Sequence, residues 1–444
     1  MNFKKWFSWI FIAVFLCGTI FAATPETPAV PDNAVELSSK GAIIGETTTD
    51  EILYEYHADD RLYPASTTKL MTALVAVEHC KPTDILTVPQ SAVEGLFEQG
   101  SSVFLKTGEQ MAFQDMLAYL LIPSGNDAAN TIADHISGSP QKFADLMNEK
   151  AKELGCTNTH FTNPNGLHDE NHYTSARDLY LIAKAAMKND LIRKIVSTVQ
   201  TDLPVTNMHA STTTITTTNH LISRIKDGRY FNADAIGIKT GTTTPAGFCL
   251  IAGFDNGDLE YISVVLGGKK DADTGDIGCY SDTLKLYKYV KDNFAMQTLA
   301  EKDAPIKEVP LQYCSGQDFM VLSPAKDFST LAPKGILKSA TVEYKVDCPK
   351  TLAAPIKKGE KLGTARLYIN DKEYGSIDLV ASSSAERSKI LYAAACVTNF
   401  FKSTVFRILL AALLAFLLIL FVTKSLRRRN NRSRRYSSKR RYRR

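Results

Sequence analysis

Three patterns that indicate other classes of protein are missing from this chain of 444 residues. There is no Cys-x-x-Cys pair, so the eight cysteines do not have the spacing typical of a metal site. There is no Gly-x-Ser-x-Gly segment, which argues against a Ser-His-Asp hydrolase. There is also no internal repeat array. The composition, with 44% hydrophobic and 22% charged residues, is that of a globular protein rather than a disordered one.

The C-terminal tail has no acidic residue, and it accounts for the positive formal charge of the whole chain. Residues 424–444 carry twelve lysines and arginines. Removing these charges and those of Lys4 and Lys5 from the formal total of +5 leaves −9 for residues 23–423. An acidic folded part argues against nucleic acid as a partner. The basic tail is expected to meet anionic lipid of the inner leaflet.

The N-terminus has the layout of a secretory signal peptide, expected at residues 1–22. Lys4 and Lys5 precede an uncharged apolar stretch that ends at small alanines. An uncleaved anchor is the alternative, but the Ala-Ala-Thr-Pro sequence that follows favours cleavage. Cys17 is not expected to carry a lipid, because Leu16 before it is bulky.

Residues 405–423 form a long apolar run with one charge, Arg407, near its outer edge. Nineteen residues of helix nearly cross a hydrocarbon core of about 30 Å, and Arg407 can reach the interface. The basic tail at 424–444 is then cytoplasmic, so a single-pass membrane protein is predicted in which everything before the span is extracytoplasmic. A helix lying flat on the membrane is the weaker alternative, since no polar stripe divides the run.

Between these ends the sequence predicts an α+β domain followed by a small all-β domain. Amphipathic patterns predict helices at 66–79, 113–122 and 127–136, the last capped by Asn126 or Asp127. Strands are predicted at 234–241, 247–254 and 259–268, the last two joined at Asn256-Gly257. The helices lie in the sequence between strands from both ends of the domain, which is typical of an antiparallel sheet with a helical cluster. The predicted parts are a linker at 23–38, an α+β domain at 39–300, a β domain at 305–383 and a juxtamembrane helix at 384–404.

The segment "YPASTTKLMTALVA" (63–76) places Ser66 three residues before Lys69, so that a helix brings both side chains to one face. A serine hydroxyl needs a base to become a nucleophile. Lysine can serve as that base only if burial or nearby positive charge lowers its pKa. An ordinary capped helix start with an exposed lysine is the alternative.

Two further triplets favour catalysis. "IPSGNDAA" places Ser124 and Asn126 in a tight connection between two helices, where a hydroxyl can relay protons and an amide can hold a substrate carbonyl. "GIKTGTTTPAG" places Lys239, Thr240 and Gly241 at a strand end. There the ammonium and hydroxyl can receive a carboxylate, and glycine can let substrate lie close to the backbone. The order S-x-x-K, S-x-N, K-T-G indicates penicillin-interacting serine enzymes.

With these motifs the chain resembles the serine-type D-alanyl-D-alanine carboxypeptidases, the low-molecular-mass penicillin-binding proteins of peptidase family S11. The resemblance runs from about residue 40 to 383. It includes "NPNGLHDENHYTSARDL" (163–179), "KTGTTTPAG" and "APIKKGEKLGTARLYINDKEYGSIDLVA". It implies a penicillin-binding/β-lactamase-like catalytic domain, with peptidoglycan stem peptides ending in D-Ala-D-Ala as substrates. It also implies β-lactams as covalent inhibitors and no cofactor.

The resemblance implies a role for each motif residue. Ser66 would be acylated, Lys69 would be its base, and Ser124 would pass a proton to the leaving amine. The substrate would be bound by Asn126, Lys239, Thr240, Gly241 and Thr242. Backbone N–H groups of Ser66 and Thr242 would form the oxyanion hole. The family often ends in an amphipathic surface helix, and the apolar run at 405–423 departs from that pattern.

Three other functions remain as alternatives. A class A β-lactamase needs a glutamate to activate the deacylating water, and "FTNPNGLHD" contains no E-x-x-L-N run. A transpeptidase differs only in whether an amine or water reaches the acyl-enzyme. A non-catalytic wall-binding protein would not need both Ser66 and Lys69. No metal site is expected, because His168 and His172 follow a loop-forming Asn-Pro-Asn-Gly and lack the H-E-x-x-H order.

Overall fold

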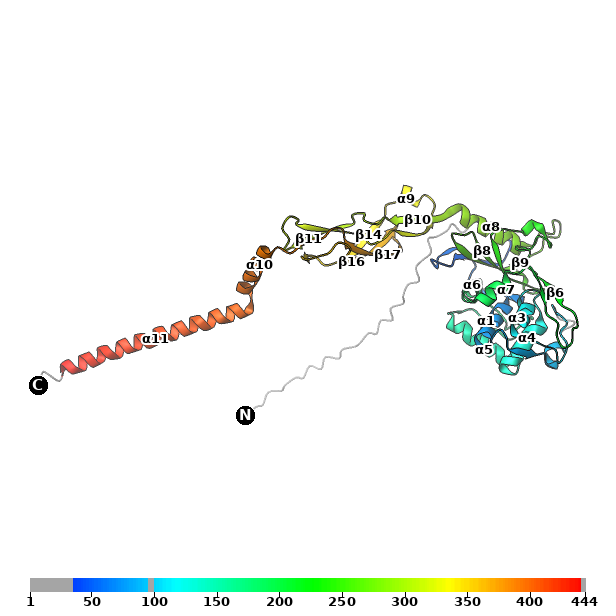
Figure 1. Cartoon of the computed structure of the whole chain (residues 1–444), viewed down its shortest axis with the longest axis horizontal. Coiled ribbons are helices and arrows are strands. Elements are labelled where there is room, and N and C mark those ends of the chain that lie inside the picture. The colour runs from blue at the N-terminus through cyan, green and yellow to red at the C-terminus, as the bar shows by residue number, and fades with distance from the viewer. Residues whose placement is uncertain (1–34, 95–99, 441–444) are drawn as a thin grey trace, which may run out of the picture. The chain divides into compact units, whose positions relative to one another are not determined.

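The computed structural model describes residues 35–94 and 100–440 (Figure 1). The predicted signal peptide at 1–22 and most of the predicted linker at 23–38 lie outside the described residues. The chain divides into two compact units. Of the described residues, the first contains 35–94, 100–295 and Leu331–Lys334, and the second contains Met296–Thr330 and 335–440.

The first unit is built on a five-stranded sheet in which each strand runs antiparallel to its neighbours. Its order is β2-β1-β9-β8-β7, with the bounds β1 Gly41–Glu46, β2 Ile52–Tyr56, β7 Ala235–Thr243, β8 Gly247–Asp255 and β9 Glu260–Gly268. The predicted hairpin is confirmed, because Asp255 pairs with Glu260 around a turn in which Gly257 has a φ of +89°. Glycine adopts this left-handed conformation without steric cost.

The two faces of this sheet belong to separate hydrophobic cores. Successive side chains of a strand point to opposite faces, so Ile43 and Val264 pack into one core while Ile44 and Val265 pack into the other. The second core includes residues of α8 (Gly278–Asn293), which lies on the opposite side of the sheet from α6 in Figure 1. The result is a layered α+β unit, which confirms the predicted fold class.

Most helices of the first unit gather on the face of the larger core. They are α1 Lys69–His79, α2 Gln90–Val93, α3 Phe113–Leu121, α4 Asn126–Ser137, α5 Pro140–Glu153, α6 Ala176–Ala186 and α7 Asp190–Val196. Two 3₁₀ turns are η1 Ala65–Thr68 and η2 Gly228–Tyr230. Two short antiparallel ladders join β3 Ile85–Thr87 to β4 Gln110–Ala112 and β5 Gln200–Leu203 to β6 Thr213–Thr216.

The second unit contains the predicted β domain. Its six-stranded sheet has the order β14-β16-β17-β12-β11-β15, in which β11 and β15 are parallel and the other neighbouring strands are antiparallel. The bounds are β11 Lys307–Gln312, β12 Phe319–Pro324, β14 Glu343–Asp347, β15 Leu352–Ala353, β16 Lys361–Ile369 and β17 Lys372–Ala381. A short helix α9 spans Ile336–Ser339, and β10 Phe294–Ala300 pairs with β13 Phe328–Pro333.

Two helices end the described chain, α10 Lys389–Lys402 and α11 Thr404–Arg440. Within α11, Thr404–Arg428 is long and apolar enough to cross a membrane, and none of its apolar window is buried in the protein. This agrees with the C-terminal helix predicted at 405–423. The helix continues past Thr423 into the basic tail, which the sequence pattern did not indicate.

Candidate active site

The segment before α1 brings Ser66 and Lys69 together. The predicted helix start at Ser66 is a 3₁₀ turn, η1, and α1 begins only at Lys69. Thr67 closes the turn by donating its hydroxyl to Pro64 O at 2.7 Å, and Ala65 has a φ of +49°. Side chains at i and i+3 eclipse in a 3₁₀ helix. Accordingly Lys69 Nζ lies 2.8 Å from Ser66 Oγ.

Lys69 is fully buried, and its amine forms hydrogen bonds to three neutral oxygens. Besides Ser66, Nζ donates to Asn126 Oδ1 at 2.7 Å and to the carbonyl of Asn165 at 2.6 Å. Burial holds the pKa of Lys69 well below its usual value, and the positive charge of Lys239 lowers it further, against a smaller rise from Asp127. A buried amine with a lowered pKa can take up a proton near neutrality. This excludes the alternative of an exposed helix-start lysine.

The second motif lies in the connection from α3 to α4. Ser124 adopts a φ of +71°, and Gly125 N donates to Tyr119 O at 2.9 Å. The predicted cap of α4 by Asn126 or Asp127 is wrong, because Gly125 is the N-cap and makes no side-chain cap bond. Asn126 is instead the first residue of the helix, and its side chain accepts from Lys69.

The third motif lies on β7 beside the η1 turn. Lys239 is 1% exposed, and its Nζ donates to Ser124 Oγ at 2.9 Å and to Thr240 O at 2.8 Å. Burial lowers its pKa to about 7. Thr240 shares a hydrogen bond of 2.6 Å between hydroxyls with Thr218. Hydrogen bonds therefore link the three motifs. Lys69 of the first motif bonds to Asn126 of the second, and Ser124 of the second motif bonds to Lys239 of the third.

Gly241 allows β7 to lie against the turn that carries Ser66. A Cβ at this position would be 2.9 Å from Pro64 O, Ser66 N and Thr67 N. Real Cβ atoms essentially never approach backbone that closely. The need for glycine therefore comes from the contact between strand and turn, a reason different from the predicted close approach of substrate.

A cavity of about 210 Å³ opens above these motifs. Five of the predicted residues line it: Ser66, Ser124, Thr240, Gly241 and Thr242. The other three, Lys69, Asn126 and Lys239, are buried, and each bonds to a motif side chain. The sequence motifs did not indicate the remaining lining residues, which are Ser101, Thr218, His220, Phe248, Ile277 and Tyr280.

The loop containing Asn165 and Gly166 is a part of the site that motif analysis missed. Asn165 accepts from Lys69 and donates its side-chain amide to Asn130 Oδ1 at 3.0 Å. A Cβ on Gly166, which has a φ of +81°, would lie 1.9 Å from Ala65 O. The loop thus packs directly on the nucleophile turn. The Asn-Pro-Asn-Gly sequence signalled a loop but not its position.

Two carboxylates near the second motif, Asp127 and Glu109, are buried. Asp127 accepts from Ser102 Oγ at 2.7 Å and from the backbone amides of Val103 and Leu105, so it fixes the segment next to Ser101. Glu109 is fully buried and bonds to Thr206 and His209. Hydrogen bonds from Lys106 N, His209 and Thr206 outweigh burial and lower the pKa of Glu109.

His168 and His172, the two histidines considered as zinc ligands, lie in different surroundings. His172 is buried, with Nε2 2.8 Å from Thr68 Oγ1 and Nδ1 accepting from Thr162 N at 3.1 Å. Burial lowers its pKa to about 4. His168 packs its ring edge-on against Tyr63. His172 thus links the side chain of Thr68 to the backbone of Thr162.

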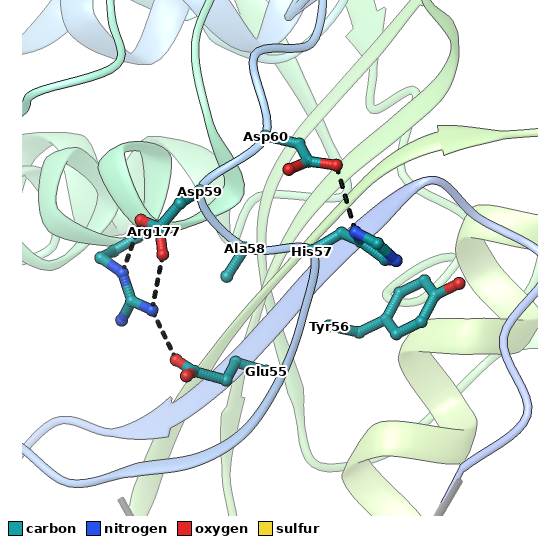
Figure 2. Close-up of a pocket in the computed structure, with 7 residues that line it drawn as sticks. All are labelled: Glu55, Tyr56, His57, Ala58, Asp59, Asp60 and Arg177. Carbon is teal, nitrogen blue, oxygen red and sulfur yellow. Dashed lines mark hydrogen bonds and ion pairs between the residues drawn. The ribbon is translucent and has the colours of Figure 1, made fainter. Parts of the chain in front are cut away.

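A second hollow, of about 590 Å³, lies between the end of β2 and the start of α6 (Figure 2). Its charged side chains pair with one another. Arg177 bonds to Asp59 at 2.8 Å and to Glu55 at 2.6 Å, and His57 lies 3.2 Å from Asp60. β2 and β7 are at opposite edges of the sheet, so this hollow is separate from the serine motifs.

The fold and the Ser66–Lys69 pair define a serine hydrolase whose serine is bonded to a buried lysine. The profile of peptidase family S11, D-alanyl-D-alanine carboxypeptidase, matches residues 25–270, and that of the penicillin-binding protein 5 C-terminal domain matches residues 294–387. The chain belongs to the D-alanyl-D-alanine carboxypeptidase family S11.

Relatives that are named as D-alanyl-D-alanine carboxypeptidases match most of the chain. It is 30% identical to the D-alanyl-D-alanine carboxypeptidase DacF of Bacillus subtilis, over 90% of this chain and 98% of that protein. It is 32% identical to DacC of Escherichia coli, over 83% of this chain and 88% of that protein. The crystal structure of penicillin-binding protein 5 from Haemophilus influenzae superposes with a TM-score of 0.59 at 28% identity, covering 80% of this chain and 99% of that one.

Proposed function

We propose that this chain removes the terminal D-alanine from peptidoglycan stem peptides through an acyl-enzyme on Ser66, and that β-lactams acylate the same serine. The observation that carries the proposal is the 2.8 Å contact between Ser66 Oγ and the buried amine of Lys69. Membership of the S11 family supports the substrate class. The enzyme is a hydrolase that needs no cofactor for these steps.

The first half-reaction uses both buried lysines. Neutral Lys69 takes the proton of Ser66 as Oγ attacks the carbonyl of the penultimate D-alanine. Backbone N–H groups of Ser66 and Thr242 stabilise the negative charge that develops on the carbonyl oxygen. Ser124, hydrogen-bonded to Lys239, relays the proton taken up by Lys69 to the leaving amine as the peptide bond breaks, which leaves Lys69 neutral again. The free D-alanine departs and leaves an ester on Ser66.

Substrate is held on both sides of the reacting carbonyl. Lys239 and Thr240 bind the terminal carboxylate, with Gly241 and Thr242 along the same strand, and Asn126 binds the substrate backbone.

In the second half-reaction water attacks the ester and Lys69 assists the proton transfer, which restores Ser66. An amine in place of water would give transpeptidation.

We also propose the setting of this reaction. Residues 1–22 form a signal peptide that exports the chain, 23–38 form a linker, and 39–300 form the catalytic domain. The β domain at 305–383 and the helix at 384–404 connect it to a single span at 405–423, with the tail 424–444 on anionic lipid at the cytoplasmic face. The apolar helix Thr404–Arg428 supports membrane anchoring.

Labelling with fluorescent penicillin tests the nucleophile, using the full-length protein in detergent. Wild type should carry label that survives denaturing gel electrophoresis, and Ser66→Ala should carry none. Ser197→Ala, at an exposed position on another element, is the matched control and should label like wild type. Release of D-alanine from a D-Ala-D-Ala peptide by wild type tests the activity. Equal labelling of Ser66→Ala and wild type would reject the assigned nucleophile.

A further inference from the structure

The segment from Thr217 to His220 forms one wall of the active-site cavity. Thr218 and His220 line the cavity, whereas Asn219 between them is buried and is not a lining residue. Burial alternates along this segment, which follows the end of β6 at Thr216 and turns on hydrogen bonds from Asn219 N to Thr217 Oγ1 and from Leu221 N to Asn219 Oδ1. The Thr218 hydroxyl bonds to that of Thr240 at 2.6 Å. His220 therefore lies on the Thr240 side of the cavity, where the terminal carboxylate is proposed to bind.

A stack of aromatic rings fixes the orientation of His220. Its ring centroid is 5.0 Å from that of Tyr280, which stacks on Tyr230 at 4.9 Å and 23°. Its backbone N donates to Tyr280 OH, and that hydroxyl donates to Thr218 O, both at 3.3 Å. Tyr230 OH in turn donates to Asp276 and accepts from Ile277 N. The imidazole is thus held in place before any ligand binds, which limits the entropy lost on binding.

Only one ring nitrogen of His220 can meet a ligand. Nδ1 is buried and has no hydrogen-bond partner within residues 35–94 and 100–440, whereas Nε2 is not among the buried atoms that lack a partner there. Burial lowers the pKa of His220, and Lys226 and Arg229 lower it further, against a rise from Asp227. The ring is therefore neutral at pH 7. A neutral imidazole that meets a carboxylate donates from the nitrogen facing it, here Nε2–H.

We infer that His220 is a substrate-binding residue that donates a hydrogen bond from Nε2 to the C-terminal carboxylate of the leaving D-alanine. It adds a directed neutral donor to the amine of Lys239 and the hydroxyl of Thr240. This assignment rests on the proposed function and extends it. Phe248, Ile277 and Tyr280 complete the wall with apolar surface, so the subsite accepts a small residue that ends in a carboxylate.

The experiment compares two substrates with three forms of the full-length protein in detergent. The substrates are an N-acylated peptide ending in D-Ala-D-Ala and the same peptide with a C-terminal carboxamide. The proteins are wild type, His220→Phe, which keeps a ring against Tyr280, and His220→Gln, which keeps a side-chain N–H donor. Saturation labelling with penicillin reports whether each variant retains a folded site.

For the free carboxylate, His220→Phe should raise KM about tenfold with little change in kcat, the effect of losing one hydrogen bond to a charged group. His220→Gln should restore most of the loss. For the carboxamide, which keeps a carbonyl acceptor but has no negative charge, the loss in His220→Phe should be clearly smaller. An unchanged KM in His220→Phe, or equal losses on both substrates, would overturn the assignment. If His220→Phe does not label with penicillin, the test falls to His220→Gln. A rise in KM of His220→Gln that is equal on the two substrates would also overturn the assignment. A wild type that neither releases D-alanine nor takes up penicillin would instead reject the proposed function itself, and the role of His220 with it.

Discussion

Lys69 donates a hydrogen bond of 2.8 Å to Ser66 although its side chain is fully buried. Burial penalises the ammonium form, and the nearby amine of Lys239 penalises it again, so the pKa of Lys69 lies well below its usual value. A protonated Lys69 cannot accept the Ser66 proton. Acylation must therefore accelerate as the pH rises through the pKa of Lys69.

Asp127→Asn should move this rising limb of the acylation rate to lower pH. Asp127 is the negative group that raises the pKa of Lys69, so its removal lets that pKa fall further and leaves the amine neutral in more acid solution. Asparagine keeps the shape of the side chain and one acceptor for the amides of Val103 and Leu105. The measurement is the second-order rate of penicillin labelling against pH.

Asp115→Asn is the matched control for this experiment. Asp115 lies in the first turn of α3 and is not among the groups that shift Lys69. Its variant should keep the wild-type profile. A rising limb that stays in place or moves to higher pH in Asp127→Asn would show that Lys69 does not set it.

Gly241→Ala should slow acylation of Ser66. The new Cβ would lie 2.9 Å from Pro64 O, Ser66 N and Thr67 N, so β7 and the nucleophile turn have to separate. Displacement of a reacting group by about 1 Å costs on the order of 100-fold in rate. The labelling rate measures this effect. Gly228→Ala is the control because nothing lies within 4 Å of its Cβ. Equal rates for both variants would refute the packing argument.

The His172→Gln variant should lose less thermal stability than wild type when the pH is lowered. Because the pKa of His172 is about 4 in the folded protein and about 6.5 in an unfolded chain, the unfolded chain takes up a proton first as the pH falls. The contribution of His172 to the free energy of unfolding is therefore constant above about pH 6.5 and declines as the pH falls from about 6.5 to 4. The measurement is the temperature at which heated protein loses half of its capacity for penicillin labelling, at pH 7.5 and 5.

The variant should show a smaller drop in this temperature between the two pH values than wild type. His135→Gln, on an exposed part of α4, is the control and should behave like wild type. If His172→Gln and wild type lose the same number of degrees, the acid sensitivity of the site comes from other groups.

The sequence predicts the parts of this fold that depend on local patterns. The apolar run at 113–122, the Asn256-Gly257 turn and the strand around Lys239 each contain their own signal, and the structure agrees with them. Ser66 and Lys69 are also a local pair. Their spacing brings them together in a 3₁₀ turn as well as in the expected α-helix.

The missed features of the site depend on contacts between distant segments. Asn165 meets Lys69 across 96 positions of sequence, and no pattern near Asn165 indicates that its carbonyl faces an amine. The same holds for His220, which lines the same cavity as Thr240 although the two residues lie on separate segments of the chain. Asp127 has a sequence context typical of a helix cap, but its acceptors are taken by amides of another loop.

Deletion of residues 389–444 should release the protein from membranes, whereas deletion of 424–444 should not. The helix Thr404–Arg428 has 25 residues, and at about 1.5 Å each they exceed a hydrocarbon core of about 30 Å. The chain without its tail keeps nearly all of this apolar length, so it should remain in the pellet after extraction with alkaline carbonate. Both forms should still label with penicillin, because the serine motifs lie in the first unit. Extraction of the tail-less form by carbonate would show that the charges of the tail, and not the apolar helix, hold the protein on the membrane.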